Sequence, residues 1–312
     1  MNRRNVLKST LATGAAFALG SPSLLAASKR SSKKHNFTFC LNTSTIRKQN
    51  LGLMRELDMA AQAGFDGIEI WMNTLQTYLK SGGKASDVRK KSEDLGLIIE
   101  DSIGFAAWVV DDEVQRNKAM EQVKQEMDVL AQIGCKRIAA PPMGATNEAG
   151  LDLLKAAERY GKMCTLGKEM GVLPQLELWG FSKNLHLFGE TLFVAAECGH
   201  SDAVILPDVY HLRRGGSPFE ALEMINGSKI QMFHINDYPG AIAKEQLTDD
   251  MRVMPGDGEA PMDSILQTLN NKGVPIALSL EIFNEDVWEM DALDACKLGI
   301  SKMKTCVDSA VR

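Results

Sequence analysis

The 312-residue sequence contains no closely spaced pair of cysteines. Six cysteines are scattered along the chain without a CxxC motif, so the pattern does not require a disulfide framework. Most of them stand in apolar contexts, which is typical of buried thiols. We therefore expect free, buried cysteines at Cys40, Cys135, Cys164, Cys198, Cys296 and Cys306.

A surplus of positive charge is also missing. The formal net charge is −5, and the acidic residues are spread along the chain instead of forming a tail. Binding to nucleic acid requires a basic face that neutralises phosphates. The composition therefore favours a small-molecule partner over a nucleic acid.

The sequence has no apolar run long enough to cross a membrane. Its first 30 residues carry the pair Arg3-Arg4, a short apolar stretch over 11–19 and small residues at 26–27, with no acidic residue before Glu56. The apolar stretch is well below the roughly 20 residues that a bilayer span needs. The pattern predicts a removable export signal and spacer over residues 1–30. "RRNVLK" resembles the twin-arginine motif, which implies a periplasmic protein with no stable membrane insertion after cleavage.

One local pattern recurs seven times along the rest of the chain. A helical stretch ends at a glycine, and a β-rich apolar run follows within a few residues. A glycine suits the left-handed position that ends a helix. The seven glycines expected in this role are Gly64, Gly96, Gly134, Gly171, Gly199, Gly227 and Gly273.

These seven units, with a first strand over 36–42, predict eight strands that alternate with helices. Such alternation indicates parallel pairing with helices on the outside. Eight units in fewer than 300 residues predict an α/β fold of the (β/α)8 TIM-barrel type, in one domain over residues 36–312. An open doubly wound sheet is less favoured, because no GxGxxG motif follows the first strand.

Acidic residues and one histidine stand at or near the ends of the last four predicted strands. They are Glu177, Asp208, His234 and Glu281. The carboxyl ends of the strands converge at one end of a parallel barrel, so these side chains are expected to meet. Three carboxylates are tolerable there if a cation joins them. One nitrogen among several oxygens suits Mn²⁺, Mg²⁺ or Co²⁺, with Zn²⁺ also possible, and we expect one ion, with Mn²⁺ favoured.

This series resembles the xylose-isomerase-like barrel superfamily of sugar isomerases and epimerases over nearly the whole chain after residue 36. Further motifs carry the resemblance: "PDVYH" with His211 three residues after Asp208, "RVMPGDG" beginning at Arg252, "GFDGIEIW" with Glu69, and "LEIFN" with Glu281. The loops "WGFSKNLH" and "RRGG" match no pattern of the family. Since such loops set specificity, the substrate stays open.

The resemblance implies a metal-dependent reaction on a keto-sugar or related polyol. Glu177 and Glu281 would move protons on opposite faces of the substrate through an enediolate, besides binding the metal with Asp208 and His234. His211 and Arg252 would hold the oxygen where negative charge develops.

Other residues are assigned more broadly. His186 is expected to bind substrate, with Asn184 beside it in the same loop. The indole rings of Trp71, Trp108 and Trp179 are expected either to form an apolar wall for the sugar or to pack the mouth of the barrel.

Three other functions compete with an isomerase or epimerase. A dehydratase or lyase would share the first proton abstraction and then expel a leaving group. A non-catalytic carbohydrate-binding barrel would need no proton transfer. The DNA-repair branch of this barrel needs additional histidines for several zinc ions, whereas only two of the five histidines stand near strand ends. A homo-oligomer remains possible.

Overall fold

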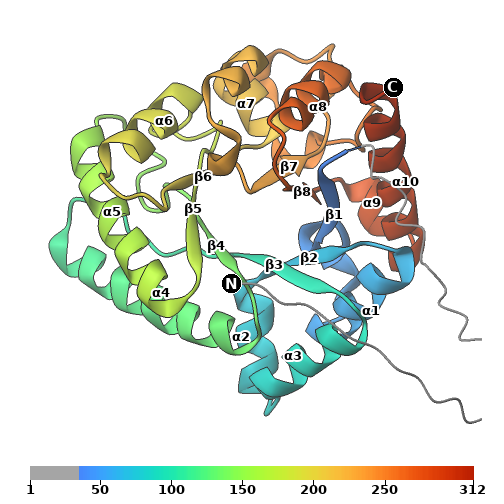
Figure 1. Cartoon of the computed structure of the whole chain (residues 1–312), viewed down its shortest axis with the longest axis horizontal. Helices are drawn as coiled ribbons and strands as arrows, with labels where there is room; N and C mark the ends of the chain where they lie inside the picture. The colour runs from blue at the N-terminus through green and yellow to red at the C-terminus, as the bar shows by residue number, and fades with distance from the viewer. Residues whose placement is uncertain (1–34) are drawn as a thin grey trace, which may run out of the picture. The chain divides into compact units, whose positions relative to one another are not determined.

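A computed structural model describes residues 35–312, in which a ring of parallel strands is surrounded by helices (Figure 1). The eight strands follow the predicted order, and most end within two residues of the apolar runs that predict them. Their bounds are β1 Phe37–Asn42, β2 Gly67–Trp71, β3 Ile98–Ile103, β4 Arg137–Ala140, β5 Leu173–Glu177, β6 Val204–Leu206, β7 Met232–Ile235 and β8 Ile276–Leu280.

Hydrogen bonds join the strands in the order β3-β2-β1-β8-β7 and β4-β5-β6, with parallel pairing throughout. Isolated parallel bridges, Ile205 with Ile230 and Asp208 with His234, connect the β6 side to β7. The prediction of an α/β TIM barrel is confirmed. The second bridge also brings two predicted metal ligands to the same level of the barrel.

Helices cover the outside of the strands, and short ones follow several strand ends (Figure 1). Their apolar faces pack on the barrel, which is why long helices alternate with the strands. The α-helices are α1 Leu53–Ala63, α2 Met72–Lys80, α3 Ala85–Asp94, α4 Glu113–Gln132, α5 Leu153–Met170, α6 Phe188–Glu197, α7 Val209–Gly215, α8 Met262–Asn271, α9 Glu285–Glu289 and α10 Ala292–Ala310. Residues 35–312 also contain five 3₁₀ segments. η1 Thr43–Gln49 precedes α1, and the others stand between α7 and α8: η2 Phe219–Met224, η3 Gly227–Lys229, η4 Lys244–Gln246 and η5 Asp249–Met251.

The helix-ending role holds for six of the seven predicted glycines and is wrong for Gly227. The six have positive φ, for example 91° at Gly64 and 73° at Gly171. Gly227 instead begins η3, where a Cβ atom would lie 2.7 Å from Cβ of Lys272 and 2.8 Å from Cγ2 of Val274. A close approach to another segment, rather than a left-handed backbone, accounts for this glycine.

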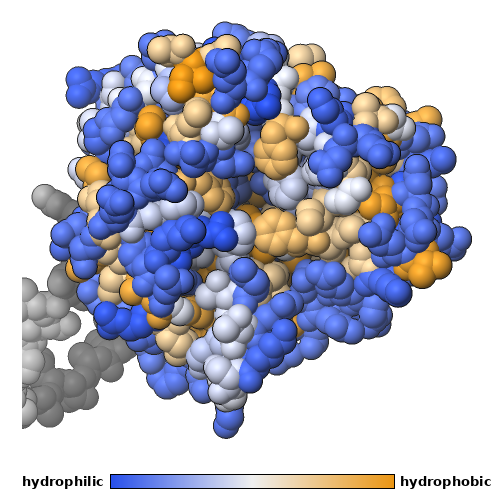
Figure 2. All heavy atoms as spheres, turned by 180° about the vertical axis from the view of Figure 1, so that it is seen from behind, coloured by the Kyte–Doolittle hydropathy of each residue, from blue (hydrophilic) through white to orange (hydrophobic). Residues whose placement is uncertain are grey.

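The six cysteines are free thiols; five are buried and Cys198 is half-buried. Within residues 35–312, no helix has both the length and the apolar character that crossing a membrane requires. The predicted export signal, residues 1–30, lies outside the described residues. The face drawn in Figure 2 is largely hydrophilic, with hydrophobic residues in scattered groups.

Candidate functional site

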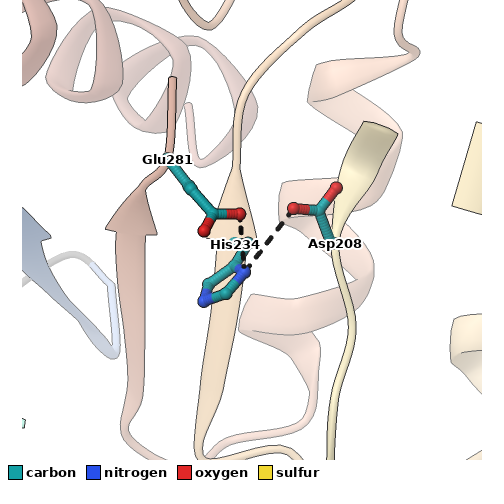
Figure 3. A group of neighbouring side chains, drawn as sticks. All are labelled: Asp208, His234 and Glu281. Carbon is teal, nitrogen blue, oxygen red and sulfur yellow. Dashed lines mark ion pairs between the residues drawn. The ribbon is translucent and has the colours of Figure 1, made fainter. Parts of the chain in front are cut away.

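Three predicted ligands meet at the carboxyl ends of β6, β7 and β8. His234 lies in β7, Glu281 directly follows β8, and Asp208 follows β6 by two residues. One ligand atom from each side chain lies within 4.8 Å of the others, and all three residues are buried. Figure 3 shows the two carboxylates on either side of the imidazole. The arrangement confirms that these three side chains converge.

Asp208 serves the local fold and the site at once. Its Oδ1 accepts a hydrogen bond of 2.8 Å from the backbone N–H of His211, so it caps the start of α7. Its Oδ2 lies 3.5 Å from Nδ1 of His234. A helix cap and a metal ligand are therefore compatible roles, carried by different oxygens of one carboxylate.

His234 is oriented by Glu69, at 2.9 Å from its Nε2. Oε2 of Glu69 accepts hydrogen bonds from Asn42 and Ser279, so this carboxylate is held in place. Nδ1 of His234 then lies 3.1 Å from Oε2 of Glu281. A histidine that binds a metal through one nitrogen usually donates its other N–H to such a carboxylate. Glu69 fits that supporting role.

The charge of this cluster calls for a cation. Burial by itself lowers the pKa of His234, but the carboxylates of Glu69 and Glu281 outweigh it and hold the pKa well above its usual range. His234 Nδ1 is fully buried and makes no hydrogen bond within the described residues. A divalent ion could replace the proton at Nδ1 and share Asp208 and Glu281. Carboxylate oxygens with one imidazole nitrogen suit a hard or borderline divalent metal.

Arg252 supplies positive charge beside the same carboxylates. Its Nη1 donates hydrogen bonds of 2.8 Å to Oδ2 of Asp208 and 2.8 Å to Oε2 of Glu281. Its Nη2 donates one of 2.6 Å to Asp249, and the guanidinium carbon lies 4.4 Å from the ring centre of Tyr210. Burial lowers its pKa, yet these carboxylates more than compensate and raise it. Arg252 is therefore a fixed, charged wall of the site.

His211 places a second donor next to Arg252. The backbone N–H of Gly180 donates to His211 Nδ1 at 3.2 Å. Burial lowers the pKa of His211 and so favours the neutral ring. With Nδ1 accepting from Gly180, the ring proton would lie on Nε2. That Nε2 lies 3.3 Å from Nη2 of Arg252. Two donors side by side are suited to one shared acceptor, such as a substrate oxygen that gains negative charge.

Glu177 ends β5 and lines the cavity beside the three-residue group without belonging to it. Its side chain is buried, and its Oε2 has no hydrogen-bond partner within the described residues. Burial raises its pKa to about 8, with Glu281 adding to the shift and His234 opposing it. Burial therefore favours the protonated form of Glu177. As a fourth ligand it stays a prediction.

The cavity of about 190 Å³ in front of these groups has aromatic walls. Trp71 and Trp179 are among them, whereas Trp108 is not. Trp108 is buried and donates to the carbonyl of Pro141, so it packs the barrel instead. The residues lining the cavity are Trp71, Ile103, Phe105, Glu177, Trp179, Phe181, His211, Asp249, Arg252, Glu281 and Phe283.

The two polar residues predicted from the loop after β5 have other contacts. His186 is half-buried, its Nδ1 is 3.2 Å from Glu190, and it is not among the residues that line the cavity. Asn184 accepts from the backbone N–H groups of Gly150 and Leu151 and donates to two carbonyls of the same loop. Asn184 therefore holds neighbouring loops together, and substrate binding by His186 stays a prediction.

Sequence reasoning missed the support that Asn42, Glu69 and Asp249 give to the site. Glu69 stood in a quoted motif at the end of β2, but its burial with His234 depends on barrel closure. Asn42 donates to Glu69 at 2.8 Å and to Oε1 of Glu281 at 3.1 Å, joining the first and last strands. Asn42 ends the first predicted strand, and that position is the only signal that could have drawn attention to it.

Curated relatives include isomerases, epimerases and dehydratases. The chain is 25% identical over 267 residues to the inosose isomerase of Bacillus velezensis, covering 83% of this chain and 92% of the relative. It is 27% identical over 242 residues to the 3-dehydroshikimate dehydratase of Pseudomonas putida, covering 75% of this chain but 36% of that protein.

Solved structures share the fold. The crystal structure of the IOLI protein with a bound zinc atom matches with a TM-score of 0.82 at 22% identity, covering 88% of this chain and 99% of that one. D-psicose 3-epimerase, solved with D-fructose, matches with a TM-score of 0.71 at 14% identity, covering 86% and 99%. A family model described as xylose isomerase-like TIM barrel matches residues 57–306. The chain belongs to the xylose isomerase-like TIM barrel family.

Proposed function

We propose that this protein is a divalent-metal-dependent isomerase or epimerase that acts on a keto-sugar or a related polyol. One observation carries the proposal: Glu281, a member of the buried group with Asp208 and His234, lines a cavity that Glu177 also lines. The inosose isomerases and fructoselysine 3-epimerases among the relatives support the reaction class. We propose Mn²⁺ as the preferred ion, because the ligand set is rich in oxygen.

A bound divalent ion would polarise the substrate carbonyl and make the adjacent C–H more acidic. Glu281, which accepts a hydrogen bond of 2.8 Å from Arg252, would accept that proton. Glu177, whose pKa is raised by burial, would return a proton from elsewhere in the cavity. Nε2–H of His211 and Nη2 of Arg252 would stabilise the oxygen that becomes negative. Trp71 and Trp179 would exclude water from the reacting face.

Deuterium exchange tests the reaction. The protein is mixed with Mn²⁺, D₂O and a panel of free keto-sugars and inososes, and deuterium at carbon is followed by NMR. We expect exchange in the wild type, and a fall of at least about 100-fold in Glu281→Gln and in Glu177→Gln, the range associated with a lost general acid or base. Glu126→Gln, the same change at a buried residue of α4, is the control. Exchange at the wild-type rate in Glu281→Gln would contradict the assignment.

A dehydratase is the second candidate, because 3-dehydroshikimate dehydratases are among the relatives. Both reactions begin with proton abstraction next to a carbonyl, and they differ in whether a leaving group departs. An isomerised product of unchanged mass supports the first candidate. An unsaturated product, detected by ultraviolet absorption and loss of water in the mass spectrum, supports the dehydratase.

Export to the periplasm remains part of the proposal, on the strength of the sequence of residues 1–30. We expect a reporter fused to this segment to reach the periplasm. Replacing Arg3 and Arg4 by lysine should abolish that transport, because the paired arginines define the twin-arginine motif. Unchanged periplasmic activity of the doubly substituted fusion would contradict the proposal.

A further inference from the structure

A second and larger cavity lies beside the catalytic one. It has a volume of about 560 Å³, and Trp71 lines both cavities. Its walls come from η1, α1, the end of β2, the start of α2 and α9. Of these segments, η1 and α2 directly follow β1 and β2, and α9 is the first helix after β8. It therefore lies at the same carboxyl end of the barrel as the candidate site.

The aromatic walls of this outer cavity are fixed in position. Nε1 of Trp71 donates to Oδ1 of Asn42 at 3.0 Å. Nε1 of Trp288 donates to the carbonyl of Ser44 at 2.9 Å. Because both indole N–H groups are already used, a ligand would contact the ring surfaces, which Arg47 and Lys48 also approach. Indole rings held this way suit the C–H faces of a sugar.

One buried polar atom of the outer cavity lacks a partner. Glu56 of α1 is 6% exposed, and its Oε2 makes no hydrogen bond within the described residues. A buried carboxylate oxygen without a donor costs free energy that a ligand hydroxyl can recover by donating to it. Glu56 therefore has unused hydrogen-bonding capacity at the wall of the cavity.

Cationic groups complete the lining. The guanidinium of Arg47 lies 4.5 Å from the ring centre of Trp71, and Nζ of Lys48 lies 5.3 Å from that of Trp288. Both side chains are exposed, and neither forms an ion pair within the described part of the chain. Hydroxyl and amide groups of Thr74, Asn50 and Asn73 line the same space. A carboxyl group among hydroxyl and amide groups offers both acceptors and donors, as the hydroxyl groups of a polyol require.

The two cavities also differ in the size of the ligand that each can hold. Small-molecule sites are usually about 300–1,000 Å³, so the catalytic cavity of about 190 Å³ suits a single small ring. The outer cavity falls inside that range. We propose that it is a second sugar subsite, which holds a neutral glycosyl unit linked to the ring that reacts in the inner cavity. This inference rests on the proposed function for the identity of the inner ring.

Calorimetry with named sugars tests the subsite. The Mn²⁺-loaded protein is titrated with methyl glucosides and with trehalose, sucrose, maltose and cellobiose. We expect at least one disaccharide to bind about 10-fold more tightly than the methyl glucosides. Trp288→Ala and Glu56→Gln should each remove most of that difference and leave methyl glucoside binding unchanged, while Trp288→Phe should keep it. Neither residue touches the catalytic cavity.

Two results would overturn the subsite. One is a wild type that binds every disaccharide no more tightly than the methyl glucosides. The other is a glucuronic-acid disaccharide that binds more tightly than its neutral counterpart and loses that advantage in Arg47→Gln. Deuterium exchange on monosaccharides is measured in the same samples. If exchange is absent while the disaccharide preference persists, the proposed function fails and the subsite stands; if exchange occurs without the preference, the reverse holds.

Discussion

Glu69 orients a predicted metal ligand, His234, without being a ligand itself. It contacts Nε2 of His234, whereas the metal would bind through Nδ1. Glu69→Gln keeps a hydrogen-bond acceptor but removes the negative charge that raises the basicity of the imidazole. We expect Mn²⁺ affinity, measured by calorimetry, to fall by about 10- to 100-fold. The control Glu126→Gln should bind Mn²⁺ as the wild type does, and equal affinities in all three proteins would contradict the supporting role.

Glu56 should make the stability of the protein depend on pH. Burial raises its pKa from 4.5 to about 7. The folded state therefore holds a proton between these values that the unfolded state has released, so this residue's contribution to stability is complete below pH 4.5 and is lost as pH rises to about 7. The shift corresponds to roughly 3 kcal/mol. Urea unfolding at pH 5 and pH 8 measures how much the free energy of unfolding falls between these values. Glu56→Gln should show a smaller fall than the wild type, and an equal fall in both proteins would contradict the assignment.

At the scale of single residues, the sequence predicted those whose position is set by strand ends. Asp208, His234 and Glu281 each stand in or just after an apolar run, so the run itself places them at one end of the barrel. Glu69 and Asp249 resisted prediction, because their roles depend on side chains from distant parts of the chain. Glu69 becomes buried, and Asp249 contacts Arg252, only when the barrel closes.

At the scale of elements, α7 packs so closely on the loop after β5 that glycines are required. A Cβ atom on Gly215 would lie 2.0 Å from the carbonyl oxygen of His186, and one on Gly180 would lie 2.4 Å from that of His211. Gly216 has a φ of 95° and ends the helix. The two glycines of the motif "RRGG", which the sequence left unexplained, are therefore required by close packing and by the end of the helix. The guanidinium carbon of Arg213 lies 5.4 Å from the ring centre of Tyr238.

Two glycine substitutions test that packing. Gly215→Ala should destabilise the protein by about 1–3 kcal/mol, because the helix must move away from the loop, and it should weaken substrate binding by displacing His211. Gly189→Ala in α6 is the matched control, since nothing lies within 4 Å of its Cβ position. It should stabilise by about 0.5–1 kcal/mol, the usual gain in a helix. Thermal unfolding and substrate titration give both readings; equal effects of the two changes would contradict the packing argument.

At the scale of the whole molecule, the repeated unit predicted the barrel because each apolar run is long enough to form a buried strand. The repeated unit does not predict the structure of the segment between β7 and α8. There the carboxylate of Asp237 accepts hydrogen bonds from the backbone of Tyr238, Gly256 and Ala260, and its main chain pairs with Val253. That folded loop brings Arg252 into the barrel. The side chain of Arg252 is 1% exposed, and this burial could not be predicted from the sequence of a loop.

Arg252 also links metal binding to global stability. Its guanidinium forms ion pairs of 2.8 Å with both Asp208 and Glu281. Arg252→Gln would leave two buried carboxylates without that partner, which should lower the free energy of unfolding by about 3–5 kcal/mol. A divalent ion supplies charge to the same two groups and stabilises the folded state by binding to it alone. Saturating Mn²⁺ should therefore raise the Tm of Arg252→Gln by more than it raises that of the wild type. Scanning calorimetry with and without Mn²⁺ measures both Tm values. An equal rise of Tm in the two proteins would show that the arginine and the metal do not share these carboxylates.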